Sequence, residues 1–442
     1  MDIENVREPS VPARELATIC VLAIVAGAVI GVVGGAFRWC LERLERWRIH
    51  TVEWAHELPG PGWLVPVGIT ILGALLAALI VRMVPLASGS GIQHVEAVDR
   101  GQAEPPPLSV LPSRFVGALL SIGSGLVLGR EGPIVHMGAA VGAETARRAR
   151  RPEHERLLQT SVSGAGLAVA FNAPIGGALF VVEEVTGSFR FRTVVPVVLS
   201  VAAAVACSRT IVGDTPDFAV DPIAPPSIVL LPVFVVFGLL TGLLGAAYNR
   251  MVLGSLSVVE SVRSISPVTK AAIIGGLIGL LSVVAPWAGG GGDSLVQHVV
   301  SGGALALPVV AWYVLLRFVA GPLSYAAGTP GGLFAPLLAL GALWGLLCAG
   351  ICAGICAAIV PGIGSSLSVP MAIAGMAALF GASVRAPITG VVLVVEMTAA
   401  TGVTVPILAA TTCAVVVAYS TRVPPIYDSL RDRMFGTPPD RG

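Results

Sequence analysis

Two charged residues, Arg130 and Glu131, stand side by side inside an otherwise apolar stretch of the chain. A charged side chain at membrane depth costs roughly 2.5–3.5 kcal/mol even on lenient insertion scales, so such a pair indicates a function. Gly129 and Gly132 flank the pair and Pro133 follows, which predicts a break in the hydrophobic segment and a new helix that begins at Pro133. The free N–H groups of that helix end would bind an anion. The anion is either the adjacent carboxylate or, once the carboxylate is protonated, a solute.

Three other short segments carry groups that could donate hydrogen bonds to the same anion. Ser90 lies between Gly89 and Gly91 at the end of an apolar stretch, where its hydroxyl could cap a helix or donate to a ligand. The segment 328–336 opens another apolar helix with glycines and a proline, so its N–H groups should also point at an anion. Tyr427 follows the last apolar stretch, and its phenol could close the inner mouth of a pathway.

The composition is that of an integral membrane protein. Of the 442 residues, 55% are hydrophobic and 12% are charged, against about 25% charged residues in soluble domains. Several apolar stretches are shorter than the roughly 20 residues of a full span, and Gly and Pro are spread through them, which indicates interrupted helices that line a pathway. The net charge of +1 predicts no nucleic-acid partner, and the long first apolar stretch indicates a retained span, not a signal peptide.

Basic residues are concentrated in four segments of the chain and acidic residues in two others. Arg and Lys cluster in residues 1–15, 143–160 and 249–270 and in the C-terminal tail. The linker 213–222 and the segment 289–293 carry Asp without any basic residue. The positive-inside rule therefore predicts that both termini are cytoplasmic and that the two acidic segments lie outside. The high content of Ala, Gly, Val and Arg suggests the inner (cell) membrane of a prokaryote.

The chain also repeats itself. Residues 173–183 align with residues 386–396, and seven of the eleven aligned positions are identical. Residues 129–133 likewise have a counterpart in residues 332–336, because both open an apolar helix with Gly-x-x-x-Pro. Two halves that each contain a broken helix are typical of a transporter built from inverted repeats, with its site between the halves.

Taken in order, these segments resemble the CLC family of chloride channels and proton-coupled chloride transporters over nearly the whole chain. The resemblance rests on Gly89-Ser-Gly-Ile92, Gly129-Arg-Glu-Gly-Pro133, Phe171-Asn-Ala-Pro174, Glu183-Glu184, Gly331-Gly-Leu-Phe-Ala-Pro336 and Tyr427. It implies an all-α polytopic membrane protein with about 17–18 tilted and broken helices in two inverted-topology repeats. We assign residues 1–212 to the first transmembrane repeat and residues 213–442 to the second, which ends in a short cytoplasmic tail. The regulatory domain common in eukaryotic members is not expected.

The resemblance also implies a chloride site. Ser90 and Tyr427 would donate their hydroxyls to a central chloride, and the N–H groups of Leu333 and Phe334 would add two donors. The supporting residues would be Gly89, Gly91, Gly129, Arg130 and Gly132. Chloride is large and weakly hydrated, so neutral donors can replace its water without holding it too tightly. The family further implies a homodimer in membrane lipid, with a separate pathway in each subunit.

Two acidic residues would handle protons in a protein of this family. Glu131 would be the outer gating glutamate and Glu184 the inner proton-relay glutamate. We assign Glu183 to structure, because it has a repeat partner in Glu396. The presence of both Glu131 and Glu184 favours proton-coupled chloride exchange, with a passive voltage- or pH-gated chloride channel of the same fold as the alternative. A fluoride-selective member is a third option.

Other classes of protein fit the sequence less well. An enzyme would need a nucleophile with a base or a metal set. His94 lies four residues after Ser90, but we expect His94 and His136 to be hydrogen-bonded packing residues. No cofactor is expected, because there is no Gly-x-x-x-x-Gly-Lys-Ser/Thr loop and the cysteines of the apolar stretches have no His or carboxylate beside them. A scaffold would not need broken helices. One departure from the family pattern is Gln93, which replaces the usual Pro after Gly-Ser-Gly-Ile.

Overall fold

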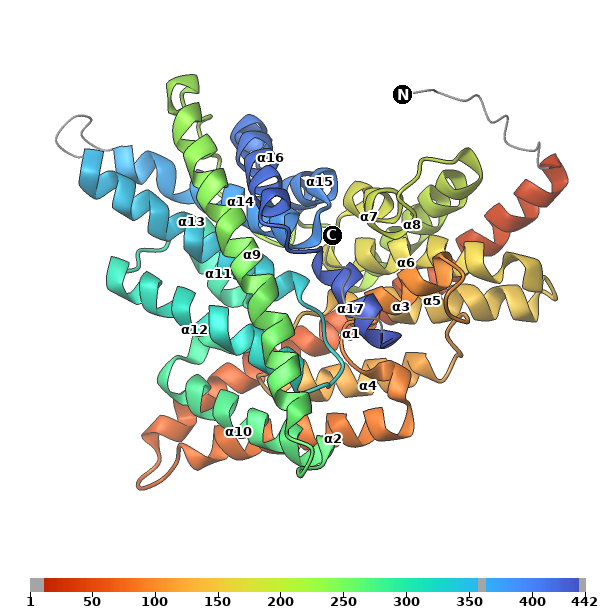
Figure 1. Ribbon diagram of the computed structural model, residues 1–442, viewed down its shortest axis with the longest axis horizontal. Helices are drawn as coiled ribbons and strands as arrows, with labels where there is room; N and C mark the ends of the chain where they lie inside the picture. The colour runs from red at the N-terminus through yellow and green to blue at the C-terminus, as the bar shows by residue number, and fades with distance from the viewer. Residues whose placement is uncertain (1–11, 357–362, 437–442) are drawn as a thin grey trace.

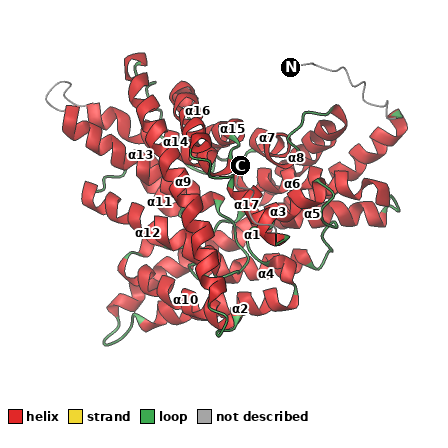
Figure 2. Cartoon of the chain, viewed as in Figure 1, coloured by secondary structure: helices red, strands yellow, loops and turns green. Residues whose placement is uncertain are grey.

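The protein is built from helices joined by loops. This computed structural model describes residues 12–356 and 363–436, and within those ranges it contains 17 α-helices and no strand (Figure 2). The expected all-α polytopic fold, with about 17–18 helices, is confirmed. Arg7 and Arg441, which belong to the predicted basic segments, lie outside the described residues.

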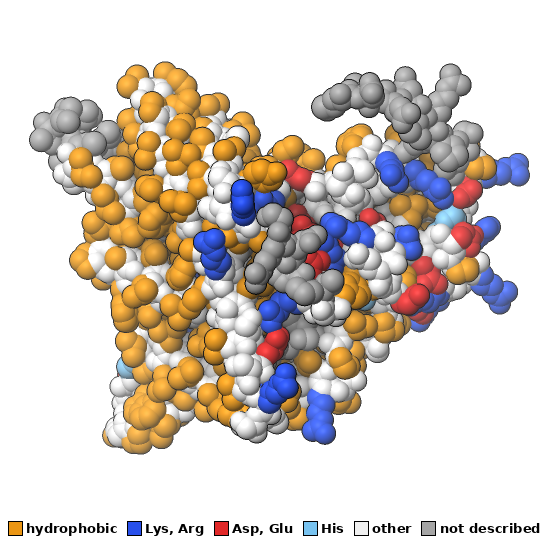
Figure 3. Space-filling view, viewed as in Figure 1, with side chains coloured by type: hydrophobic (Ala, Val, Ile, Leu, Met, Phe, Trp, Pro, Cys, Tyr) orange, Lys and Arg blue, Asp and Glu red, His pale blue; other side chains and the backbone are white. Residues whose placement is uncertain are grey.

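Nine helices in the described ranges are long and apolar enough to cross a membrane. They are α1 (Ala13–Glu57), α2 (Leu64–Met83), α8 (Phe191–Val212), α9 (Leu231–Ser261), α10 (Pro267–Val284), α12 (Leu307–Ala326), α13 (Phe334–Cys356), α14 (Ile363–Val384) and α16 (Thr404–Ser420). The shorter helices are α3 (Ile92–Asp99), α4 (Val110–Gly123), α5 (Glu131–Arg148), α6 (Glu155–Phe171), α7 (Pro174–Phe180), α11 (Asp293–Val300), α15 (Pro387–Thr398) and α17 (Ile426–Met434) (Figure 1). Hydrophobic side chains cover the region of α9, α12 and α13, whereas charged side chains gather at the centre and right of the same view (Figure 3).

The first helix is much longer than its apolar stretch. The apolar residues end near residue 40, but α1 continues to Glu57. Residues 41–57 contain no Gly or Pro to end the helix, and they bury Arg48. The Arg48 guanidinium donates to the Gly289 carbonyl at 3.4 Å. This end of α1 is therefore attached to the second half of the chain.

Both expected helix interruptions are present. α4 ends at Gly123, and α5 begins at Glu131 and not at Pro133. The predicted start was wrong by two residues, because a proline in the first turn lacks only an N–H that has no partner within the helix anyway. In the second half of the chain, α12 ends at Ala326 and α13 begins at Phe334.

The interrupted segments pair with one another through short backbone contacts. Gly129 and Gly332 exchange two N–H···O hydrogen bonds of 2.8 Å each. Gly89 donates to the Thr329 carbonyl at 3.2 Å and accepts from the Gly331 N–H at 3.1 Å. Backbone that is not helical inside a membrane must find its partners within the protein, and here the partners are the other interrupted segments.

The first and last long helices of each expected half pack closely against each other. A Cβ added to Gly27 of α1 would lie 2.3 Å from the Ser200 carbonyl oxygen of α8. A Cβ added to Gly238 of α9 would lie 2.3 Å from the Ala410 carbonyl oxygen of α16. Small residues allow such helix contacts in membranes. The same geometry recurs in both parts of the chain, while the exact division at residues 212 and 213 stays a prediction.

The repeated segments α7 and α15 cap each other. Glu183, at the end of the first segment, accepts from the N–H groups of Ile388 and Thr389 in the first turn of α15, at 3.0 and 2.6 Å. Glu396, at the end of the second, does the same with the first turn of α7, at 3.0 and 2.7 Å. A carboxylate stabilises a helix N-terminus because it accepts from free N–H groups and faces the positive end of the dipole. The structural role expected for Glu183 is confirmed.

We expect Glu183→Ala to lower the free energy of unfolding by about 1–2 kcal/mol, the usual cost of losing a side-chain helix cap. Glu183→Gln keeps an acceptor oxygen and should lose less. Thermal unfolding of the purified protein in detergent measures both, with Glu53→Ala, an exposed residue of α1, as the control. An unchanged midpoint for Glu183→Ala would contradict the capping role.

Candidate functional site

Four of the expected site residues converge where the interrupted segments meet. The Phe334 N–H donates to the Glu131 carboxylate at 2.6 Å. The rings of Phe334 and Tyr427 contact each other, with centroids 5.5 Å apart. The Ser90 hydroxyl lies so close to α5 that a Cβ added to Gly132 would be 2.4 Å from its oxygen. Residues far apart in the chain thus form one buried cluster.

The Glu131 carboxylate lies at the start of α13, between Gly129 and Gly332. One oxygen accepts from the Phe334 N–H, and the other has no hydrogen-bond partner among the described residues. A Cβ added to Gly129 or Gly332 would lie 2.2 Å from a carboxylate oxygen, so this position of the side chain requires glycine on both sides. Leu333 is fully buried just before Phe334. The carboxylate occupies a helix N-terminus, where a solute anion would also bind.

The hydroxyl groups of Ser90 and Tyr427 are unsatisfied. Both residues are fully buried, and neither hydroxyl has a hydrogen-bond partner of normal geometry within the described part of the chain. The two hydroxyls are near enough to interact with each other. A buried polar group without a partner costs about 1–3 kcal/mol. Two such groups side by side indicate a site for a ligand that accepts hydrogen bonds.

A buried arginine that the sequence analysis did not single out holds the Ser90 loop. The Arg114 guanidinium donates to the carbonyl oxygens of Leu86, Ser88, Gly89 and Ser90 at 2.5–3.0 Å. These contacts hold the loop in place and satisfy its carbonyl groups, while the Ser90 hydroxyl has no partner among the described residues. In the sequence Arg114 stands at the edge of an apolar stretch, where basic residues commonly flank a membrane span and indicate no special role.

The two histidines near the site form a hydrogen-bonded pair, as expected. Nδ1 of His94 lies 3.0 Å from Nε2 of His136, and both side chains are buried. His94 belongs to α3, which follows the Ser90 loop, and His136 belongs to α5, which begins at Glu131. The pair therefore fixes the position of two site elements relative to each other.

Glu184 lies beside the central cluster, on the side of α17. Residues 181–185 form a π-helical turn after α7, a rare geometry that is frequent at functional sites. Glu184 interacts with the Glu96 carboxyl group and, electrostatically, with the Tyr427 hydroxyl. Glu96 is buried and accepts from Arg431 at 3.1 Å. Glu96 was not among the residues expected at the site, although an acidic residue so soon after the Ser90 loop was a signal.

Arg130 belongs to an ionic network on the opposite side of the cluster. Asp217 has a side chain only 2% exposed, and its carboxylate bridges Arg130 at 2.7 Å and Arg38 at 2.5 Å. Asp293 lies 3.7 Å from Arg130. From the sequence, Asp217 was expected only as part of the acidic linker 213–222. In the structure this linker folds back and neutralises the arginine next to Glu131.

Two cavities approach the cluster. The cavity on the Arg130 side has a volume of about 380 Å³ and is lined by Arg38, Arg130, Asp217 and Asp293, among others. The cavity on the Ser90 side has a volume of about 410 Å³ and is lined by Ser88, Gly89, Gly91, Gln93 and Tyr325, among others. The interrupted segments that form the site thus lie between two openings.

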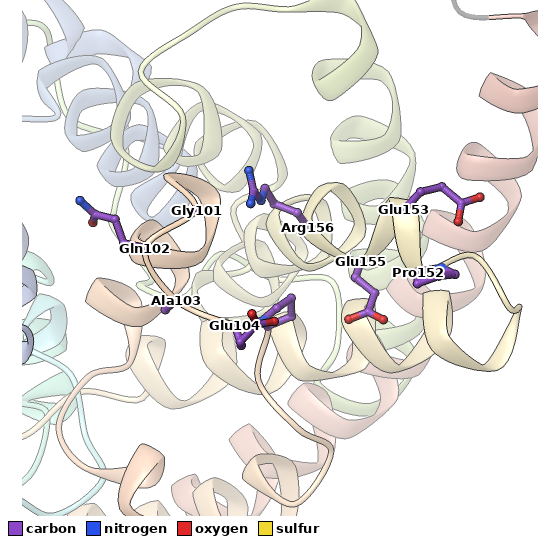
Figure 4. Close-up of a pocket in the computed structure, with 9 residues that line it drawn as sticks. Gly101, Gln102, Ala103, Glu104, Pro152, Glu153, Glu155 and Arg156 are labelled. Carbon is purple, nitrogen blue, oxygen red and sulfur yellow. The ribbon is translucent and has the colours of Figure 1, made fainter.

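A third cavity, of about 710 Å³, lies away from these residues. It is formed by the loop after α3 and by the segment before and at the start of α6, with Glu153, Glu155 and Arg156 around it (Figure 4). None of the expected site residues lines this cavity, so it has no part in the cluster described above.

Known proteins resemble the chain over most of its length. Residues 72–419 match the family model described as voltage gated chloride channel. The chain is 34% identical to the H(+)/Cl(-) exchange transporter ClcA of Vibrio parahaemolyticus over 430 residues, which cover 94% of this chain and 90% of that protein. It resembles the structure of a slow cyanobacterial Cl-/H+ antiporter with a TM-score of 0.88 and 29% identity, over 97% of this chain and 99% of that one. Its fold also resembles that of a CLC-type fluoride/proton antiporter, with a TM-score of 0.77 and 22% identity, over 95% and 98% of the two chains.

Replacing Asp217 by Ala should destabilise the protein by about 3–5 kcal/mol, because two buried guanidinium groups lose the carboxylate between them. The matched control is Asp214→Ala, which removes an exposed ion pair with Arg209 and should cost less than about 1 kcal/mol. Unfolding midpoints of the two variants in the same detergent provide the comparison. Similar small losses in both would contradict a supporting role for the Asp217 bridge.

Proposed function

The chain belongs to the voltage-gated chloride channel family, and on that premise we propose that it exchanges chloride for protons across a membrane. The observation that carries the proposal is the Glu131 carboxylate on the Phe334 N–H, next to the unpaired hydroxyls of Ser90 and Tyr427. The carboxylate occupies a donor that chloride would use, so protonation of Glu131 frees this donor for chloride. Proton and chloride occupancy are thereby linked without a cofactor.

Chloride would bind between the hydroxyls of Ser90 and Tyr427 and the N–H groups of Leu333 and Phe334. These donors are neutral, so they replace the water of a weakly hydrated anion and still let it leave. The Arg114 guanidinium lies behind the Ser90 loop, and its Nη1 and Nη2 atoms donate to carbonyl oxygens. It adds positive potential at the site without a direct bond to the ion.

Protons would reach Glu131 from the side of Glu184. The Tyr427 hydroxyl is near enough to both carboxyl groups to interact electrostatically with each of them. Glu184 also interacts with Glu96, and two carboxyl groups at close range favour the sharing of one proton. The Glu184–Glu96 pair would hold a proton and pass it toward the central cluster.

Proton-coupled exchange explains the site better than the alternatives do. A passive chloride channel has no need of a second carboxyl group beside Tyr427, and the relative from Vibrio parahaemolyticus is named an exchange transporter. The likeness to a fluoride/proton antiporter, at 22% identity, concerns the fold alone. The relatives are transporters, and we propose no enzymatic activity.

We propose that both termini are cytoplasmic, in the cell membrane of a prokaryote. Arg147 and Arg148 lie in the last turn of α5, and Arg431 and Arg433 lie in the last turn of α17. The positive-inside rule assigns these helix ends to the cytoplasm. The cavity on the Ser90 side, which Arg433 helps to line, would then open inward, and the cavity beside Asp217 outward.

We propose further that the protein is a homodimer. The mutually capped helices α7 and α15 have only 7 and 12 residues, too few to span a membrane, where about 20 are needed. Ile175 and Ile388 in their first turns are 60% and 58% exposed. A second copy of the chain against this surface would cover the apolar side chains and shield the polar helix ends from lipid.

Glu131→Gln should uncouple protons from chloride, because an amide cannot ionise or carry a proton. Chloride-driven proton transport should fall at least about 100-fold, the lower range of what a positioned proton-transfer group contributes, while chloride still passes. Purified protein in liposomes, with a chloride electrode and a pH electrode, measures both fluxes. Chloride flux in the wild type without any uphill proton movement would favour the channel alternative.

Glu184→Gln should reduce proton transport to a similar degree, about 100-fold, and leave chloride flux. The neighbouring Glu183→Gln is the matched control, because its carboxyl group caps α15 and should not carry protons. The same liposome assay applies. If Glu184→Gln reduced both fluxes equally, or if Glu183→Gln behaved like it, the relay role of Glu184 would be wrong.

A further inference from the structure

The side chain of Gln93 lines the Ser90-side cavity. Its Oε1 accepts from the Gly91 N–H at 3.1 Å. Its amide also interacts with the Tyr325 hydroxyl, which accepts from the Ser90 N–H at 3.3 Å. Gln93, Gly91 and Tyr325 all line the cavity. The amide therefore contacts both the Gly91 N–H and the Tyr325 hydroxyl at the wall of this cavity.

The backbone beneath Gln93 is arranged to offer hydrogen-bond donors to a ligand. Gly91 has a left-handed conformation, with φ of 87°, at the start of α3. Arg114 donates to the carbonyl oxygens of Gly89 and Ser90, and the partner of the Gly91 N–H is the Gln93 side chain. The hydroxyl of Ser90, fully buried and without a partner among the described residues, lies next in the chain. This is a place for an anion, and the Gln93 oxygen occupies one of its donors.

We propose that the Gln93 carboxamide is a neutral stopper, which an anion entering from this cavity must displace from the Gly91 N–H. The inference rests on the proposed chloride transport and goes beyond it, because it names a residue that sets the affinity for chloride on one side only.

Gln93 and Glu131 both occupy an N–H donor, but they differ in chemistry. In the central cluster a Glu131 carboxylate oxygen accepts from the Phe334 N–H at 2.6 Å. Glu131 can be neutralised by a proton, which weakens its hold on that donor. An amide does not ionise, so competition from Gln93 is constant and is overcome by chloride concentration alone.

Removing the amide should make chloride binding from this cavity easier. For Gln93→Ala we expect the half-saturating chloride concentration on the cavity side to fall about two- to tenfold, the equivalent of one ordinary hydrogen bond. The half-saturating concentration on the opposite side should not change, because the outer donors are untouched.

Two further variants separate hydrogen bonding from bulk. Gln93→Met keeps the length of the side chain without an acceptor oxygen, and it should behave like Gln93→Ala. Gln93→Glu keeps an acceptor and adds a charge that repels chloride, so the half-saturating concentration on the cavity side should rise. The matched control is Gln102→Ala, an exposed glutamine in the loop after α3. Unfolding midpoints of all variants verify that they fold.

The experiment measures uptake of radioactive chloride into right-side-out and inside-out membrane vesicles from an expressing strain, so that each side is tested separately. A shift on one side only, in both the Ala and the Met variants, supports the proposal. No shift on either side, an equal shift on both sides, or a Met variant equal to wild type would overturn it. Absence of chloride uptake by the wild type would instead overturn the proposed function and this inference with it.

Discussion

The contact between the Glu131 carboxylate and the Phe334 N–H imposes the main constraint on this structure. It requires a helix that starts inside the membrane, an acidic residue that reaches it, and backbone close enough to leave no room for a Cβ at Gly129 or Gly332. A continuous helix could not offer that N–H, because its own carbonyl groups would already bind it. The interruptions between α4 and α5 and between α12 and α13 follow from this need.

Interrupted helices leave polar backbone inside the membrane, and the rest of the fold satisfies it. Gly129 and Gly332 bind each other, and Arg114 binds the carbonyl oxygens of the Ser90 loop. Buried charges also have partners within the protein, because Asp217 forms ion pairs with Arg38 and Arg130. The groups that remain unpaired among the described residues include the hydroxyls of Ser90 and Tyr427, where an ion would bind.

The repeat explains how a site between two halves keeps its geometry. Glu183 and Glu396 each cap the helix that corresponds to their own, so the two halves are joined by a symmetric pair of contacts. Gly27 and Gly238 allow equivalent close helix packing in the two parts of the chain. Such mutually supported elements can hold hydrogen-bond donors in fixed positions.

Much of the site was readable along the chain, because its features are expensive in a membrane. The sequence contains the charged pair Arg130 and Glu131 with glycines and a proline beside it, and the repeated glutamate Glu183. Such residues in an apolar sequence indicate a structural or functional role. Contacts between residues distant in the sequence could not be predicted. The bridge through Asp217 and the carbonyl groups around Arg114 depend on how loops fold back onto helices. No local pattern encodes such contacts, since each depends on two segments that only packing brings together.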